Sequence, residues 1–222
     1  MKNLIQKTFI GSAQLITGLG AMLFVPAWTL DYWQAWVYLS VFGVSVALIF
    51  AYLYKNDAKL LERRLNRVEK EKSQKRIQLY LYISYVSLFI LASVDHRFGW
   101  SHVPFSAVMA GDILVATGYL IIFLVLKENT FAAATIELSS GHKVISTGAY
   151  AVIRHPMYSG AVVMLLGTPL ALGSWWALAD FILMTCIIVL RLLDEEKFLS
   201  EGLGGYKEYC QKIKYRLLPF VW

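Results

Sequence analysis

Long apolar segments recur along this 222-residue chain, and they constrain its fold more than any other feature. A helix needs about 20 apolar residues to cross a bilayer. Hydrophobic residues make up 58% of the chain and charged residues only 16%, a balance too apolar for an ordinary soluble domain of this length. The pattern predicts an all-α polytopic membrane protein with about six membrane helices, near residues 4–25, 33–54, 78–94, 105–126, 157–172 and 174–193.

The carboxyl-terminal part has two further structural signals. Only Gly173 and Ser174 separate the last two apolar segments, which predicts a tight helical hairpin. After the hairpin, residues 194–222 mix charged and aromatic side chains. This mixture predicts a cytoplasmic amphipathic helix that folds back over the membrane face and ends at Leu218-Pro219.

Positive charge predicts the orientation, because Lys and Arg are retained in cytoplasmic loops. The loop 55–76 carries nine of the 21 basic residues. If this loop lies inside, both termini and residues 127–157 also lie inside, and only Arg97 is left outside. The net charge of +6 therefore suits anionic lipid headgroups next to the membrane better than a nucleic acid. We expect an integral multi-pass protein whose active end faces the cytoplasm.

The chain divides near residue 126 into two parts. Residues 1–126 are interpreted as a scaffold of membrane helices with the basic loop 55–76, which begins as a helix on the membrane surface. We interpret this loop as a solvated, lipid-touching connector in preference to a polybasic binding face. Residues 127–222 contain a long polar stretch, the hairpin and the tail. A long loop in a compact protein is usually functional, so the second part is the expected catalytic core.

Two polar clusters flank the predicted hairpin. Residues 154–156, Arg-His-Pro, precede its first helix, and Arg191 with Glu195 and Glu196 closes its second. Proline suits a first helical turn, and the free N–H groups there bind a carboxylate or a hydroxyl. Arg191 lies one turn before Glu195, so a cation and an anion share a face. Alone, each cluster is more typical of a helix cap or a juxtamembrane charge belt; together, at the inner ends of one hairpin, they indicate a site.

With these residues, the chain resembles the isoprenylcysteine carboxyl methyltransferase family, which includes phospholipid methyltransferase relatives. The resemblance covers residues 127–222, whereas the earlier segments are similar only as apolar spans. Gly204-Gly205-Tyr206 departs from the family's spacing in the tail. The matching motifs are His142-Lys-Val-Ile145, Thr147-Gly-Ala-Tyr150, Arg154-His-Pro-Met-Tyr158, Arg191 with Glu195-Glu196, and Tyr206 with Tyr209.

The resemblance implies methyl transfer from S-adenosylmethionine to an acceptor that enters from the bilayer. Tyr150 and Tyr158 are expected to pack against adenine, and the backbone at Val144 and Ile145 to hydrogen-bond its edge. A carboxylate after the second hairpin helix would hold the ribose hydroxyls or the ammonium. The expected cofactor-binding residues are His142, Lys143, Val144, Ile145, Tyr150, His155, Pro156, Met157, Tyr158, Glu195 and Glu196.

Arg191 and Arg154 are the candidate catalytic residues. Arg191 is suited to orient a substrate carboxylate through a two-pronged hydrogen bond. A carboxylate acceptor needs no general base, whereas an amine or a thiol would need His155 or a glutamate. A prenylated cysteine carboxylate, a phospholipid amine, a quinone-like lipid, and a small apolar thiol or acid all stay open as acceptors. No metal site is predicted.

Two other functions compete with this interpretation. Membrane sterol reductases, which use NADPH, have a related Arg-His-Pro segment, but Met157 stands where they usually have asparagine, and paired glutamates replace their acidic-cysteine pattern. This reading ranks second. A non-catalytic membrane protein or transporter would use Asp112 and Asp180 as a polar path, although a transport site belongs near the bilayer midplane. We expect these two aspartates to pair or to make polar contacts within the bundle.

Overall fold

The computed structural model describes residues 2–65, 72–131 and 144–222, and within these ranges the ordered elements are helical. The expected all-α class is confirmed for these residues. An isolated bridge between Ile153 and Tyr215 joins two otherwise irregular segments. The elements are α1 (Lys2–Ala27), α2 (Trp33–Asn56), α3 (Ala58–Leu65), α4 (Lys72–Phe98), α5 (Phe105–Glu128), η1 (Gly148–Ala151), α6 (Pro156–Ala171), α7 (Leu178–Gly202) and α8 (Tyr206–Lys212).

Four helices, α1, α2, α4 and α5, are long and apolar enough to cross a membrane. The protein is therefore an integral multi-pass membrane protein. Helix α6 has 16 residues, fewer than the roughly 20 that a straight crossing needs. Helix α7 has 25 residues, but five of its last nine residues are charged. Two further crossings by α6 and α7 thus stay a prediction.

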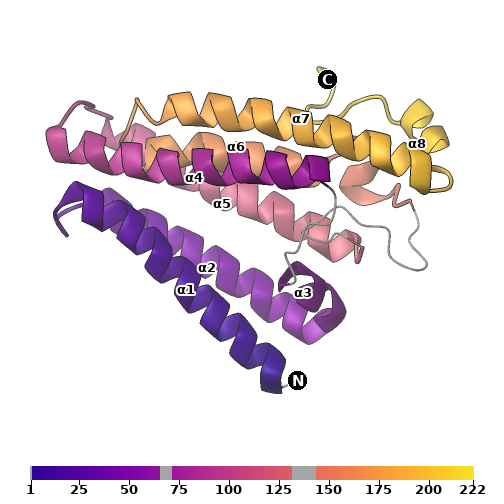
Figure 1. Ribbon diagram of the computed structural model, residues 1–222, viewed down its shortest axis with the longest axis horizontal. Helices are drawn as coiled ribbons and strands as arrows, with labels where there is room; N and C mark the ends of the chain where they lie inside the picture. The colour runs from indigo at the N-terminus through magenta and orange to yellow at the C-terminus, as the bar shows by residue number, and fades with distance from the viewer. Residues whose placement is uncertain (1, 66–71, 132–143) are drawn as a thin grey trace.

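The helices form two groups (Figure 1). Helices α4, α5, α6 and α7 run alongside one another, while α1 and α2 form a pair that spreads away from them toward one end. The α1–α2, α4–α5 and α6–α7 connections lie at one end of the molecule. The other end holds α3, α8 and the start of α6 (Figure 1), so the two polar clusters of the sequence come to the same end.

Glycines bring α5 and α6 into very close contact. A Cβ on Gly118 would lie 2.6 Å from the carbonyl oxygen of Gly160, and one on Gly111 would lie 2.3 Å from the backbone nitrogen of Ala171. In lipid, small residues allow helix backbones to approach and gain van der Waals contact. The short helix α6 is therefore held along a helix of full membrane length, and its first turn is placed beside the end of α5.

The predicted hairpin is present, with a turn at residues 172–177 between α6 and α7. Gly173 has φ +72°, a left-handed conformation that glycine adopts without steric cost. Next to it, the hydroxyl of Ser174 donates to the buried carboxylate of Asp95. The same carboxylate accepts the backbone N–H of Ser101 at 2.7 Å. These bonds tie the hairpin turn to the α4–α5 connection, far from the polar clusters.

The predicted surface helix is present as α3, but the expected solvated connector is wrong for this segment. Leu60 and Leu61 are fully buried and pack with Leu53 and Leu126 at the ends of α2 and α5. The carboxylate of Asp57 accepts the backbone N–H of Leu60 at 2.9 Å, as an N-terminal cap does. Because of this packing, α3 is a docked part of the bundle.

The expected single amphipathic helix after the hairpin is also wrong. Helix α7 continues through residue 202, and α8 has only seven residues. Gly205 lies between them at φ +82°, where an L side chain would be strained. Residues 213–222 are not helical. The charged and aromatic tail is therefore divided among the end of α7, one short helix and an irregular strap.

The two membrane aspartates differ in their surroundings. The Asp180 carboxylate accepts a hydrogen bond from the Ser87 hydroxyl at 3.2 Å, which links α7 to α4. The predicted polar contact within the bundle is thus confirmed for Asp180. Asp112 is buried on α5, and neither of its carboxylate oxygens has a hydrogen-bond partner among the described residues. The two aspartates do not pair with each other.

Candidate active site

A cavity of about 780 Å³ begins at the polar end of the bundle and continues between the membrane helices. Pro156 and Glu196 are not among its described lining residues. His142 and Lys143 lie outside the described residues, so their predicted roles stay predictions. The other residues predicted for the site all line this cavity: Val144, Ile145, Tyr150, Arg154, His155, Met157, Tyr158, Arg191 and Glu195.

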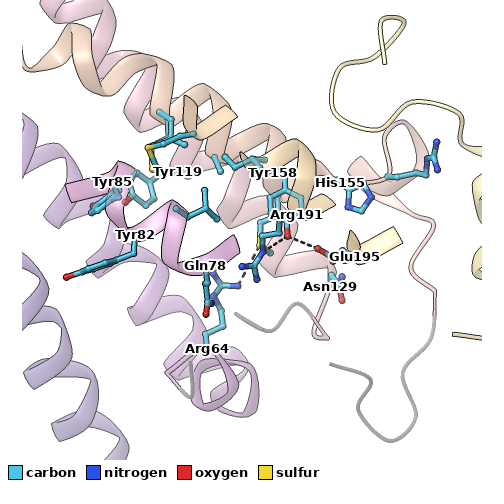
Figure 2. Close-up of a pocket in the computed structure, with 18 of the residues that line it drawn as sticks. Arg64, Gln78, Tyr82, Tyr85, Tyr119, Asn129, His155, Tyr158, Arg191 and Glu195 are labelled. Atoms are coloured by element: carbon cyan, nitrogen blue, oxygen red, sulfur yellow. Dashed lines mark hydrogen bonds between the residues drawn. The ribbon is translucent and has the colours of Figure 1, made fainter. Parts of the chain in front are cut away.

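Tyr158 links the cation Arg191 and the anion Glu195, which both lie on the side of α7 that faces the cavity. Its hydroxyl donates to Glu195 Oε2 at 2.6 Å and accepts from Arg191 Nε at 3.0 Å (Figure 2). Arg191 and Glu195 share a face, as their spacing of four residues predicted. Because Tyr158 belongs to the first turn of α6, this network joins both arms of the hairpin. A carboxylate and a guanidinium are thereby held in fixed positions at one cavity wall.

Tyr150 also lines the polar region of the cavity. The amide of Asn129, just after α5, donates to the Tyr150 hydroxyl at 2.9 Å. The hydroxyl of Tyr209 on α8 donates to the Tyr150 carbonyl oxygen at 2.8 Å. Burial raises the pKa of Tyr150 to about 12, so its phenol is neutral at physiological pH. The ring can serve as a flat stacking surface, and Asn129 is a supporting residue that the sequence analysis missed.

Glu196 occupies a separate ionic cluster behind this wall. Its Oε1 lies 2.8 Å from Arg154 Nη1 and 3.2 Å from His155 Nε2, and its Oε2 lies 2.9 Å from Arg216 Nε. Burial raises the pKa of Glu196, but hydrogen bonds from His155 and Arg216 and the nearby positive charges outweigh it, so the pKa lies below its usual range. Three protein partners therefore surround a carboxylate that was expected to hold the cofactor.

The strap after α8 completes this cluster by pairing with the segment before α6. The backbone N–H groups of Arg154 and His155 donate to the carbonyl oxygens of Tyr215 and Arg216 at 2.9 and 3.0 Å. The guanidinium of Arg216 also lies 5.1 Å from the ring centre of Trp222. No role for Arg216 was predicted from the sequence. A basic residue among the aromatic side chains of the tail was the available signal, but its partner 20 positions away, Glu196, was not apparent from the sequence.

The cavity becomes apolar away from the polar wall. Tyr82, Tyr85 and Tyr119 lie along this side (Figure 2). Further apolar lining comes from α1, α4 and α7, namely Leu15, Leu19, Met22, Leu81, Met184 and Ile188. A lipid-like chain can therefore occupy one part of the cavity while a polar group occupies the other.

A family model described as phospholipid methyltransferase matches residues 106–205, which contain α6, α7 and all of α5 except its first residue. A probable protein-S-isoprenylcysteine O-methyltransferase of Oryza sativa subsp. indica is 35% identical over 88 residues, 39% of this chain and 46% of its own length. The Arabidopsis thaliana protein-S-isoprenylcysteine O-methyltransferase B is 33% identical over 88 residues, 39% of this chain and 44% of its own length. Residues 106–205, a little under half of the chain, are therefore similar to proteins of the isoprenylcysteine and phospholipid methyltransferase type, in agreement with the resemblance of the motifs.

The Delta(14)-sterol reductase of Mus musculus is also similar, with 31% identity over 91 residues, 40% of this chain and 22% of its own length. The chain thus spans less than half the length of each of these relatives that it matches. The family match begins at residue 106. Helices α1–α4, which supply much of the apolar side of the cavity, lie before it.

Proposed function

We propose that the protein transfers a methyl group from S-adenosylmethionine to a membrane-associated, lipid-like acceptor, with the carboxylate of an isoprenylcysteine-like or similar lipid as the favoured acceptor. The observation that carries this proposal is the bonded set of Tyr158, Glu195 and Arg191 at the polar end of a cavity that continues between membrane helices. A polar cofactor and an apolar acceptor can meet only where two such environments adjoin.

The residues present fit S-adenosylmethionine. The cavity volume of about 780 Å³ lies within the roughly 300–1,000 Å³ of small-molecule sites. Glu195 supplies a carboxylate for ribose hydroxyls or an ammonium, and Tyr150 supplies a neutral ring. Tyr206 also lines the cavity. Its buried hydroxyl has no hydrogen-bond partner of normal geometry among the described residues, so it can bond to a ligand. When bound, S-adenosylmethionine supplies an electrophilic methyl group.

Arg191 is the proposed residue for the acceptor. Its Nε is held by the Tyr158 hydroxyl, which fixes the plane of the guanidinium. A planar guanidinium binds a carboxylate through two parallel hydrogen bonds and so sets its direction. Orientation of this kind lowers the barrier of a two-substrate reaction, and an ionised carboxylate needs no proton removed before it reacts.

Arg154 and His155 have a supporting role in this proposal. Both contact Glu196, and their backbone holds the carboxyl-terminal strap. They therefore position the start of α6, where Tyr158 sits. We also propose that this end of the molecule faces the cytoplasm, because the basic residues that favour that side gather there.

Calorimetric titration of the purified protein in detergent with S-adenosylmethionine, S-adenosylhomocysteine and NADPH tests the proposal. Binding of the first two, weakened in Glu195→Gln, is expected. The similarity to a sterol reductase favours a second candidate, an NADPH-dependent reductase. Binding of NADPH alone would establish that candidate, and binding of none of the three would point to a protein without this chemistry.

A further inference from the structure

We propose that Arg64 is a specificity residue that, together with Arg191, selects acceptors with an acidic headgroup. This inference rests on the proposed function, because it concerns the acceptor part of the same cavity. Arg64 belongs to α3, outside residues 106–205 that match the family model. The residue therefore comes from a part of the chain for which that match implies no role.

Arg64 reaches the cavity from the side of α3, while Arg191 enters it from α7 (Figure 2). The Nη1 of Arg64 lies 3.7 Å from the sulfur of Met157 in the first turn of α6. Its positive charge also acts on the Tyr150 phenol, whose pKa it lowers against the larger effect of burial. The guanidinium of this partly buried residue is thus a part of the polar region.

Helix α3 holds Arg64 in this position. Leu60 and Leu61 are fully buried beneath the helix, and the neighbouring Arg63 donates to the carbonyl oxygen of Thr130 at 3.2 Å. Arg63 and Arg64 are adjacent on α3, but their side chains contact different partners. The two arginines therefore have different structural roles. Arg63 ties α3 to the segment after α5, whereas Arg64 lines the cavity.

The charges around the cavity favour an anionic headgroup. Among the described lining residues, the cations are Arg64, Arg154 and Arg191, and the one carboxylate is Glu195. Among these described residues, guanidinium groups therefore outnumber carboxylates beside the apolar part of the cavity. Guanidinium groups in a site of low dielectric bind carboxylates strongly. A neutral or cationic headgroup would gain nothing from Arg64.

Matched pairs of acid and amide test this inference without catalysis. Calorimetry would compare N-acetyl-S-farnesylcysteine with its carboxamide, and oleic acid with oleamide, on the full chain with S-adenosylhomocysteine present. For at least one pair, the acid should bind about tenfold or more tightly than its amide, as expected for a hydrogen bond to a charged group. Arg64→Gln should remove most of that preference and Arg64→Lys part of it. Lys59→Gln, at an exposed position of the same helix that does not line the cavity, is the control and should keep it.

The outcomes separate the inference from the proposed function. If no acid binds better than its amide, or if folded Arg64→Gln retains the wild-type preference, the specificity role is wrong even when the cofactor binds. If S-adenosylhomocysteine fails to bind but the preference for acids depends on Arg64, the methyltransferase proposal fails while the acidic-ligand site stands. An unchanged melting temperature of Arg64→Gln, or the intermediate effect of Arg64→Lys, excludes loss of folding as the cause.

Discussion

Glu195 and Glu196 are adjacent in the chain, yet their carboxylates lie in different environments. Glu195 lines the cavity and accepts the Tyr158 hydroxyl at 2.6 Å, while Glu196 lies among Arg154, His155 and Arg216. Consecutive residues of an α-helix point about 100° apart, so the end of α7 presents one acid to the cavity and the other to the neighbouring protein segments. Ligand binding and stability should therefore respond separately to the two substitutions.

Glu195→Gln should weaken the binding of S-adenosylmethionine by about tenfold, the usual effect of losing a hydrogen bond to a charged group. The melting temperature should change little, because the amide oxygen of glutamine can still accept the Tyr158 hydroxyl that joins the two arms of the hairpin. Calorimetry and a thermal melt of the same preparation measure both quantities. An unchanged affinity for the cofactor would refute the assignment of Glu195.

Glu196→Gln should instead lower the melting temperature at neutral pH. The folded-state pKa of Glu196 is below its usual range, so its ionised form stabilises the fold at pH values above the unfolded pKa of about 4.3. This contribution is lost as the pH falls through the folded pKa. Wild type and variant should therefore differ at pH 7 and converge on acidification. Glu208→Gln, at an exposed position of α8, is the control; a gap independent of pH would contradict the prediction.

Arg191→Ala should leave cofactor affinity nearly unchanged and lower kcat/KM for a carboxylate acceptor by about ten- to a hundredfold. The reason is that its guanidinium is proposed to orient the acceptor and not to bind the cofactor. Steady-state methyl transfer with a prenylated cysteine measures the first effect, and calorimetry the second. If neither quantity changes, Arg191 belongs to the juxtamembrane charge belt.

Gly118→Ala should destabilise the bundle by about 1–3 kcal/mol, as overpacking of a close contact does. The new Cβ would lie 2.6 Å from backbone atoms of α6, which cannot move without separating the helices. Gly20→Ala on α1 is the matched control, since a Cβ there meets nothing within 4 Å and alanine favours a helix by up to about 1 kcal/mol. Thermal melts in detergent compare the two. Equal melting temperatures would show that α5 and α6 can separate at little cost.

The local sequence determined the elements of this protein. Uninterrupted apolar segments define helices that can cross a membrane, because in lipid each backbone polar group must be bonded within its own segment. Gly173 defined the hairpin turn, and the spacing of Arg191 and Glu195 placed both on one helix face. These features depend on residues near each other in the chain, which is why they could be predicted.

Only the tertiary structure decided how these elements share the site. It placed Arg64 of α3 in the cavity, and it brought Glu196 into an ion pair with Arg216 of the carboxyl-terminal strap. It also brought the backbone of α5 at Gly118 against α6. Contacts between residues far apart in the chain depend on which helix faces pack together and in what register, and a local pattern of charge and hydropathy is compatible with many such arrangements.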